Sequence, residues 1–320
     1  MNETIRRFAN LFAGVQHAYG SDQGFAVHRP VTPYRYEQHL MGIEPIGIYP
    51  CIQPPDGRLN PTSTGLFVKW GCCDIDTGDW SETWRLYTAL DKMGLCPHIE
   101  RSRSKGWHIW VFASTWVPAA TMRRALKVAY KAIGLPAKEA NPKSEHLRPS
   151  QLGNYVRLPY KGHLGVPAGQ RWPDRQVFMC QFDTNHDGKP LNLKDWLGEY
   201  TGIPPATVSP ETLNHWADKW YEPPRPNLGI TSTEALQDGP LAALCARLPR
   251  SLRGLWENGP KTAHKRSEGL TALAYQSAQA GFTPDEVFHL VQSADRIWGK
   301  YHTREGAEGY ILDLVERAFK

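Results

Sequence analysis

Residues 66–79 read LFVKWGCCDIDTGD, an apolar, β-rich run that ends in two aspartates separated by one isoleucine. Because alternate residues of a strand share a face, Asp74 and Asp76 should project from the same side of a sheet. Cys73 and Ile75 should point the opposite way and anchor the strand in the core. The stretch therefore predicts a strand with one buried face and two carboxylates at its end.

This pair of aspartates suggests a divalent-metal site. Along a strand, the Cα atoms of Asp74 and Asp76 would lie about 6.6 Å apart. Their carboxylates can converge on two ions, which lie about 3.5–4 Å apart in two-metal sites, and carboxylate oxygens suit Mg²⁺ or Mn²⁺. Taken alone, however, a D-x-D pair is better explained as a solvated strand end. The metal hypothesis therefore depends on the rest of the sequence.

The cysteines and one acidic loop suggest other sites. Cys72 and Cys73 face opposite sides of a strand, and no C-x-x-C pair supports a zinc site, so both should be packing residues. Residues 183–194 begin like a calcium loop, but Lys194 stands where that loop needs a bidentate glutamate. A hairpin turn at residues 187–188 explains this segment better.

Composition sets wider bounds. The chain has 320 residues, enough for two domains or for one large domain with an appendage. Its formal charge of +5 permits a nucleic-acid partner without requiring one. No apolar run approaches the roughly 20 residues that span a bilayer, and residues 1–20 lack the apolar region of a signal peptide. Six irregularly spaced cysteines argue against a disulfide framework. We therefore expect a cytoplasmic protein without membrane contact.

From residue 66 the pattern becomes regular and predicts an α+β fold. In chain order we expect a strand at 66–76, a helix at 81–94, strands at 97–102 and 107–113, a helix at 119–134, and strands at 154–160 and 175–183. Ser81 should cap the first of these helices, and Gly94 and Gly134 should end them. The order strand–helix–strand–strand–helix–strand is that of a split β-α-β arrangement, a small antiparallel sheet backed by two helices. Such a sheet leaves one face open for chemistry.

The rest of the chain flanks this core. Residues 1–65 should form an N-terminal α/β module with a helix at 5–15, and residues 66–200 the core. Residues 201–240 are rich in proline and turn residues and should form a linker with a short helix at 211–219. Residues 241–320 should form a small all-helical domain, with helical segments at 240–249, 265–281, 283–299 and 306–320.

The segment 101–112, RSRSKGWHIWVF, places a tight turn before a histidine. The turn offers backbone N–H groups, the Ser104 hydroxyl and the Lys105 ammonium, which together could cradle a triphosphate. The His108 imidazole could donate a hydrogen bond to a phosphate. Considered alone, this segment is better explained as a basic hairpin tip with a surface histidine.

The segment 138–163, KEANPKSEHLRPSQLGNYVRLPYKGH, supplies further charged groups. Glu139 or Glu145 could complete a metal site beside the D-x-D pair. Arg157 could bind a phosphate through two parallel hydrogen bonds.

In this order, the D-x-D at a strand end, the glycine-containing turn that closes on His108 and the acidic residue ahead of GNYVRLP resemble the core motifs of archaeo-eukaryotic primases. The chain looks most like the phage and plasmid primase-polymerase branch of that superfamily. Residues 11–20 and 39–50 resemble the N-terminal module that precedes the first motif there. Residues 265–291 and 298–302 resemble the helical, PriCT-like domain that often follows the primase core. The resemblance implies an RRM-like split β-α-β catalytic sheet.

The resemblance also implies residue roles. Asp74, Asp76 and Glu139 would be the catalytic metal ligands for two Mg²⁺ or Mn²⁺ ions, with Glu145 and Asp183 as rivals for the third carboxylate. The nucleotide-binding residues would be Ser104, Lys105, His108, Arg157 and His163. Template contacts during initiation are candidate roles for Lys265, Arg266 and Lys300, for which ordinary solvated helix charge is an equally good explanation.

The implied function is that of a DNA-dependent primase-polymerase. Such an enzyme synthesises primers on single-stranded DNA and extends them from NTPs or dNTPs by two-metal nucleotidyl transfer. The sequence has no Walker A motif, so a separate replicative helicase would be a partner. The implied setting is phage, plasmid or mobile-element replication, in the bacterial cytoplasm or an infected host cell.

Two other function classes remain open. A D-x-D metal-dependent glycosyltransferase predicts a nucleotide-binding α/β domain before the motif, which residues 1–65 do not clearly supply. A non-catalytic replication-initiation or single-strand-binding module predicts exposed aromatic residues on the sheet face and tolerates loss of the carboxylates.

Overall fold

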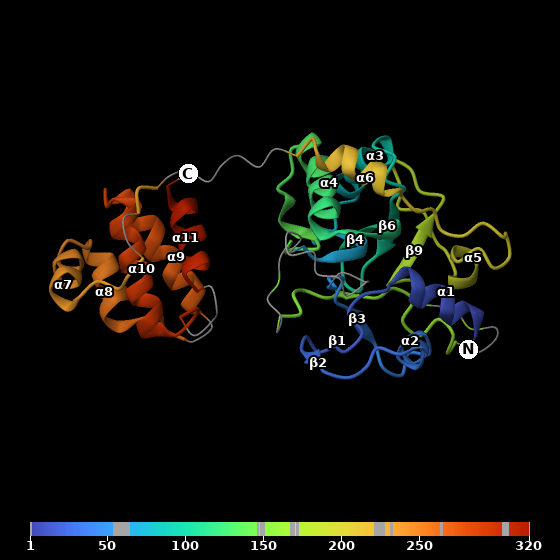
Figure 1. The fold of residues 1–320 in the computed structure, drawn as a ribbon, viewed down its shortest axis with the longest axis horizontal. Helices are drawn as coiled ribbons and strands as arrows, with labels where there is room; N and C mark the ends of the chain where they lie inside the picture. Colours follow the sequence, from blue (N-terminus) through green and yellow to red (C-terminus); the bar gives the residue numbers. More distant parts are fainter. Residues whose placement is uncertain are drawn as a thin grey trace. The chain divides into compact units, whose positions relative to one another are not determined.

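The computed structural model describes residues 2–53, 65–145, 147, 151–166, 170, 173–220, 228–230, 233–262, 265–302 and 307–319. The chain divides into two compact units, Met1–Tyr221 and Glu222–Lys320 (Figure 1). The first unit mixes helices with two antiparallel sheets, and the described part of the second is helical. The expected α+β class is confirmed.

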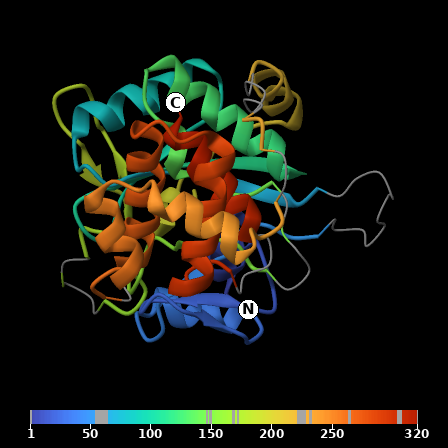
Figure 2. The same cartoon turned by 90° about the vertical axis from the view of Figure 1, so that its left-hand side faces the viewer.

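The first unit is built on a six-stranded antiparallel sheet with the order β10-β9-β5-β6-β4-β7. Its strands are β4 (Phe67–Ile75), β5 (His98–Arg101), β6 (Trp107–Pro118), β7 (Ala140–Asn141), β9 (Val177–Cys180) and β10 (Lys189–Pro190). The helices α3 (Trp80–Lys92) and α4 (Ala119–Ala132) cover one face of this sheet (Figures 1 and 2).

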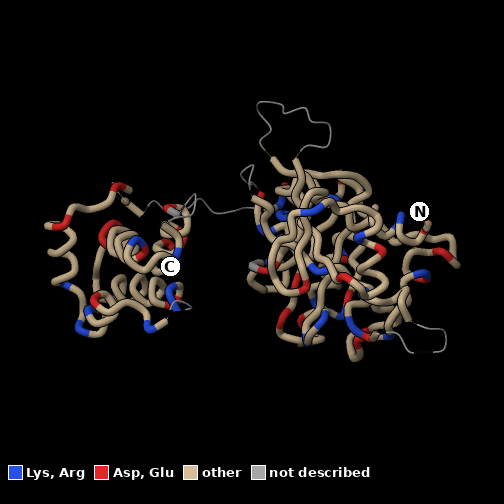
Figure 3. The backbone as a smooth tube through the Cα atoms, turned by 90° about the horizontal axis from the view of Figure 1, so that it is seen from below, with Lys and Arg blue, Asp and Glu red and all other residues tan. Residues whose placement is uncertain are grey.

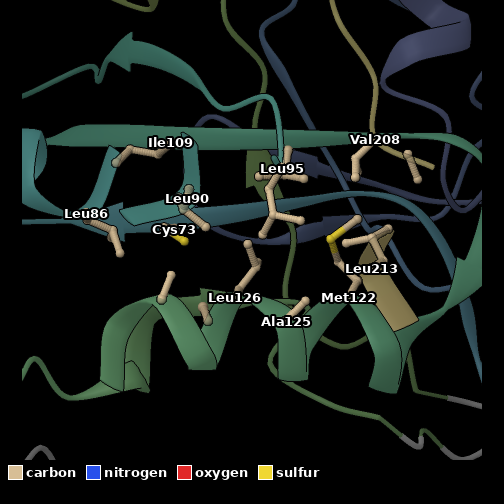
Figure 4. Packing of buried hydrophobic residues seen from close by; sticks show 14 of the residues in the cluster. Cys73, Leu86, Leu90, Leu95, Ile109, Met122, Ala125, Leu126, Val208 and Leu213 are labelled. Atoms are coloured by element: carbon tan, nitrogen blue, oxygen red, sulfur yellow. The ribbon is translucent and has the colours of Figure 1, made fainter. Parts of the chain in front are cut away.

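The helix-covered face holds the first core, and β4 contributes to it through alternate residues. Cys73 and Ile75 are buried there, as expected, in the same cluster as Leu126 of α4, and Figure 4 shows Cys73 on the side of the sheet that faces this helix. Gly71 lies on the same face, where a Cβ would come 2.8 Å from Leu126 Cδ1 and from Met122 Cγ. The missing side chain therefore lets α4 pack closely on β4.

The cysteines of β4 are packing residues. Cys72 and Cys73 are both fully buried, on opposite faces of the sheet, and all six cysteines of the chain are free. Burial raises the pKa of Cys73 to about 12, which makes a thiolate unavailable near neutral pH.

A second, four-stranded sheet has the order β2-β1-β3-β8 and is also antiparallel. It contains β1 (Tyr19–Ser21), β2 (Ala26–Val27), β3 (Ile46–Ile48) and β8 (Val156–Arg157), with the helices α1 (Glu3–Leu11) and α2 (Pro33–Leu40) in the same part of the chain. The run 154–160, expected in the main sheet, instead supplies β8, which pairs with β3. The main sheet receives β7 in its place, a two-residue strand too short to leave a sequence pattern.

The expected open face of the main sheet is covered. Trp70, Trp110 and Phe112 are fully buried in a second core. The Phe12 ring, just after α1, lies 5.0 Å from the Trp110 ring and 5.2 Å from the Phe112 ring. The N-terminal elements and α5 (Leu193–Trp196) close this face, because its large aromatic residues need apolar partners. The prediction of an open sheet face was wrong.

Several local predictions were close. The helix expected at 5–15 ends at Leu11, and α3 is capped by Asp79, which accepts a hydrogen bond from the Ser81 N–H at 2.9 Å, rather than by Ser81 itself. Gly94 and Gly134 follow α3 and α4 with φ of +69° and +72°, the left-handed geometry that ends a helix. The hairpins β5–β6 and β9–β10 are both present.

The segment 201–220 belongs to the first unit rather than to a linker. Its helix α6 (Pro210–Ala217) packs on α4, and Leu213 is fully buried in the first core. Val208 forms a bridge with Ala113 of β6. The unit boundary falls near residue 221, and residues 221–227 and 231–232 of the expected linker lie outside the described residues.

The second unit has its own core. Its helices are α7 (Asp238–Ala246), α8 (Arg250–Asn258), α9 (Arg266–Gln279), α10 (Pro284–Trp298) and α11 (Ala307–Ala318). Sequence analysis missed α8, whose nine residues include a glycine and which is held by burial of Leu252. The expected start of α10 is confirmed, with Thr283 and Glu286 forming a capping box. None of the helices within the described ranges is long and apolar enough to cross a bilayer.

Candidate active site

A cavity of about 180 Å³ lies at the end of β4 and is lined by residues of both sheets. Its lining residues are Asp74, Asp76, Glu100, Ser102, Arg103, Ser104, His108, Asn141, Lys143, Asn154, Tyr155, Val156, Arg157 and Gln176. Five residues singled out from the sequence are thus brought together, namely Asp74, Asp76, Ser104, His108 and Arg157. Along the first unit, basic and acidic positions are interspersed rather than gathered into one charged stretch (Figure 3).

The two aspartates share this cavity, as their spacing predicted. The Asp74 side chain is 33% exposed, and Asp76 follows the last residue of β4 and is exposed. Burial raises the pKa of Asp74, His108 opposes that effect, and the nearby charges of Asp76 and Glu139 raise it further. The ionised carboxylates therefore repel one another, and a bound cation would relieve the repulsion.

A divalent cation fits this oxygen-rich donor set. Within the described residues, no three His, Cys, Asp or Glu side chains are already gathered as a ligand cluster. Asp74 and Asp76 nevertheless offer carboxylate oxygens to one cavity, which suits a hard ion such as Mg²⁺ or Mn²⁺.

Glu139, predicted as the third carboxylate, does not itself line the cavity, although its charge acts on Asp74. Glu139 ends a short 3₁₀ turn (Ala137–Glu139) just before β7, and its Oε2 lies 2.5 Å from Nζ of Lys143, which lines the cavity. Its rivals are engaged elsewhere. Glu145 pairs with Arg123 and Arg124, and the Asp183 carboxylate accepts backbone N–H groups within its own turn.

Two glycines hold the β5–β6 turn against the end of β4. A Cβ on Gly106 would lie 2.3 Å from the Ile75 carbonyl oxygen, and one on Gly78 would lie 2.8 Å from the Lys105 carbonyl oxygen. Only glycine allows such close backbone contact. This contact places Ser104 beside the aspartates, whereas the exposed Lys105 is not among the residues that line the cavity.

A buried carboxylate that sequence analysis missed lies behind His108. The Glu100 side chain is 1% exposed, and its Oε2 lies 2.9 Å from Nδ1 of His108 and accepts a hydrogen bond from the Trp110 indole N–H at 2.6 Å. Burial opposes ionisation of the imidazole, but the charge and hydrogen bond of Glu100 outweigh it and raise the pKa of His108. Glu100 lies directly opposite His108 in the β5–β6 hairpin, so the register of the expected hairpin could have indicated that these two side chains meet.

One predicted nucleotide-binding residue does not reach the cavity. His163 is buried, its ring lies 4.9 Å from the Tyr160 ring, and burial lowers its pKa to about 4. It is absent from the cavity lining, so a contact with nucleotide there is not supported. Its surroundings are those of a packed core histidine.

The three predicted template contacts lie in the second unit. Arg266 donates hydrogen bonds to the carbonyl oxygens of Trp298 and Gly299, at 3.0 and 2.7 Å, and so engages the C-terminal end of α10. Lys265 directly precedes α9, and the Lys300 ammonium lies 5.8 Å from the Tyr301 ring centre.

Comparison with known proteins agrees with this geometry. Residues 17–169 match the family model described as the archaeo-eukaryotic primase domain of the TOTE conflict system. The matched segment holds every residue that lines the cavity except Gln176. No curated protein matches the chain significantly. Residues 17–169 thus carry an archaeo-eukaryotic primase domain, of the superfamily that the sequence motifs resemble.

Proposed function

We propose that the first unit is the catalytic core of a DNA-dependent primase-polymerase. The observation that carries the proposal is the convergence of Asp74, Asp76, His108 and Arg157 on one cavity inside a primase domain. Carboxylates for metal, an imidazole and a guanidinium for phosphate are the groups that nucleotidyl transfer requires.

The topology supports a catalytic sheet of the RRM-like kind. The chain runs β4, α3, β5, β6, α4, β7, and these strands lie in the order β5-β6-β4-β7. This is the strand order of a split β-α-β unit with both helices on one face. Because residues 265–291 and 298–302 resemble it, we also propose that the second unit is the PriCT-like domain that accompanies such cores.

In this proposal Asp74 and Asp76, together with Glu139, would hold two Mg²⁺ or Mn²⁺ ions. Divalent ions bound there would supply activation of a 3′-hydroxyl and neutralisation of charge on the leaving pyrophosphate. The chain's own groups position the nucleotide. His108, fixed by Glu100, and Arg157 donate hydrogen bonds to phosphate oxygens, and Ser104 presents a hydroxyl at the cavity wall.

The partners follow from the reaction class. Single-stranded DNA would be the template, NTPs or dNTPs the substrates, and a separate helicase would unwind the duplex. Phage, plasmid or mobile-element replication is the setting we propose, and the matched family's description, which names a conflict system, is compatible with it.

The test is extension of a primed and of an unprimed single-stranded template with NTPs or dNTPs and Mn²⁺. The wild-type chain should extend primers and start new ones. The double variant Asp74→Ala/Asp76→Ala should do neither, and Asp187→Asn, a carboxylate outside the cavity lining, serves as the matched control. Full synthesis by the double variant would refute the metal site. Extension without initiation would leave a polymerase that does not prime.

The non-catalytic alternative is less well supported. It needs exposed aromatic residues on the sheet face, and Trp70 and Trp110 are fully buried there. A glycosyltransferase would instead hydrolyse or transfer sugar from a nucleotide-sugar, and the same assay with such donors would reveal it.

A further inference from the structure

Three cationic side chains from separate parts of the first unit converge on one carboxylate, Asp22. Nη1 of Arg103, in the β5–β6 turn, lies 2.7 Å from its Oδ1. Arg157, on β8, donates from Nη2 to the Asp22 carbonyl oxygen at 3.2 Å, and its Nε lies 3.6 Å from Oδ1. Nζ of Lys161 lies 3.5 Å from Oδ2. Asp22 itself directly follows β1, in the N-terminal sheet.

This cluster adjoins the cavity. Arg103 and Arg157 line it together with Asp74 and His108. The Nε atom of Arg157 is buried and has no hydrogen-bond partner among the described residues. Arg157 therefore retains an unused donor, its Nε, after its Nη2 has bound the Asp22 carbonyl oxygen.

The charges in the cluster do not balance. Within the cluster, three cations face one carboxylate, which leaves two positive charges. The other carboxylates of the cavity lie outside the cluster, with Glu100 bound to His108 and with Asp74 and Asp76 at the proposed metal site. Cations held this close repel one another, and a shared carboxylate offsets part of that repulsion. An anion with several charges, such as a diphosphate or triphosphate, matches both the surplus charge and the forked donors of two arginines.

We propose that Asp22 is a positioning residue that holds Arg103, Arg157 and Lys161 ready to receive the phosphate groups of the incoming nucleotide. The proposal rests on the proposed function, because it takes the cavity to be the nucleotide site. It gives the N-terminal sheet a part in substrate binding through Arg103 and Arg157, which line the cavity, because Asp22 directly follows β1 of that sheet.

The first test measures binding of inorganic tripolyphosphate to the full chain without metal, by calorimetry at low salt. Asp22→Asn keeps the size of the side chain and removes its charge. It should weaken binding by about tenfold, equivalent to about 1.4 kcal/mol, and Asp22→Glu should restore part of it. The matched control is Asp187→Asn, which breaks the part-buried Arg101–Asp187 pair, neither residue of which lines the cavity, and which should bind like the wild type.

The direction of the change in tripolyphosphate affinity distinguishes a positioning role of Asp22 from a blocking role. If Asp22 merely occupied the phosphate position, Asp22→Asn would bind tripolyphosphate more tightly, and that result would overturn the proposal. Unchanged binding would overturn it too. Each variant should still unfold in one cooperative transition above the assay temperature, which excludes loss of folding as the cause.

A second readout uses activity. In primer extension, Asp22→Asn should raise the KM for nucleotide while kcat stays close to the wild-type value, because no group that touches the reacting atoms has changed. If the wild type shows no synthesis but binds tripolyphosphate through Asp22, the proposed function fails while the phosphate cluster stands.

Discussion

Asp74 and His108 lie directly opposite each other in the register of β4 and β6, with 3.6 Å between Oδ1 of the aspartate and Nε2 of the imidazole. Glu100 holds the other ring nitrogen from behind. The imidazole therefore lies between a buried carboxylate, which fixes it, and a cavity carboxylate, which we assign to metal.

This arrangement predicts the effect of removing the charge of Glu100. In Glu100→Gln the pKa of His108 should fall, because burial then acts with less opposition. The pKa can be measured by NMR titration of the metal-free protein, in which the other histidines serve as internal controls. An unchanged His108 titration would contradict the assigned role of Glu100.

The same shift has a consequence for stability. Since the pKa of His108 is raised on folding, its protonated form stabilises the fold fully below the unfolded pKa, and this contribution is lost as pH rises through the folded pKa. Glu100→Gln should flatten that part of the pH dependence of the unfolding free energy.

The third carboxylate can be assigned by three matched substitutions. Glu139→Gln should greatly reduce primer extension at low Mn²⁺ and recover partly at high Mn²⁺, because a ligand is lost next to Asp74. Glu145→Gln and Asp183→Asn should leave extension unchanged, because both carboxylates are engaged away from the cavity. Loss of activity in either of these, with Glu139→Gln active, would reverse the assignment.

Tyr155 lines the cavity, and its ring packs directly against the backbone of Gly20 and Gly47. A Cβ on Gly47 would lie 2.3 Å from Cδ2 of the Tyr155 ring and 2.9 Å from the Val156 carbonyl oxygen. Gly47→Ala should therefore cost about 1–3 kcal/mol in free energy of unfolding and reduce nucleotide binding. Gly65→Ala, where a Cβ would meet nothing within 4 Å, is the control for urea unfolding. Equal stability of the two variants would show that the ring moves freely.

Arg266 offers a test in the second unit. Because its guanidinium binds carbonyl oxygens at the end of α10, Arg266→Ala should lower the free energy of unfolding by about 1–2 kcal/mol. Lys300→Ala should leave stability nearly unchanged, and its affinity for single-stranded DNA at several salt concentrations tests the proposed template contact. If Arg266→Ala weakened DNA binding without any loss of stability, the capping role would be wrong.

Part of the site could be predicted from the sequence. The alternation in β4 is a short-range feature, and it placed Asp74 and Asp76 on one side. The turn before His108 did not by itself place that residue beside them, because their proximity depends on the pairing of β4 with β6, and only the family resemblance indicated it. By contrast, the two residues of β7 adopt a strand because they pair with Cys72 and Cys73 of β4, and not because of a pattern in their own sequence.

Long-range pairing explains the remaining differences. The run around Arg157 has the pattern of a strand, but nothing in it indicates that its partner is Gly47 of β3. From the sequence alone, Trp70 and Trp110 could equally form an exposed surface for base stacking or a buried core. They are buried because distant residues such as Phe12 pack on them. The roles of Glu100 and Arg103 become visible only in the structure, where Glu100 contacts His108 and Arg103 contacts Asp22.

The junction between Asp22 and Arg157 joins residues 135 positions apart in the chain. Contacts of such high separation close late, because the entropy of the intervening loop must be lost before they form. A nascent or truncated core could thus have its sheet, helices and carboxylates in place and still lack a finished nucleotide pocket. Completion of the nucleotide pocket would then be the last step of folding, because it requires the segment around Asp22 to meet the segment around Arg157.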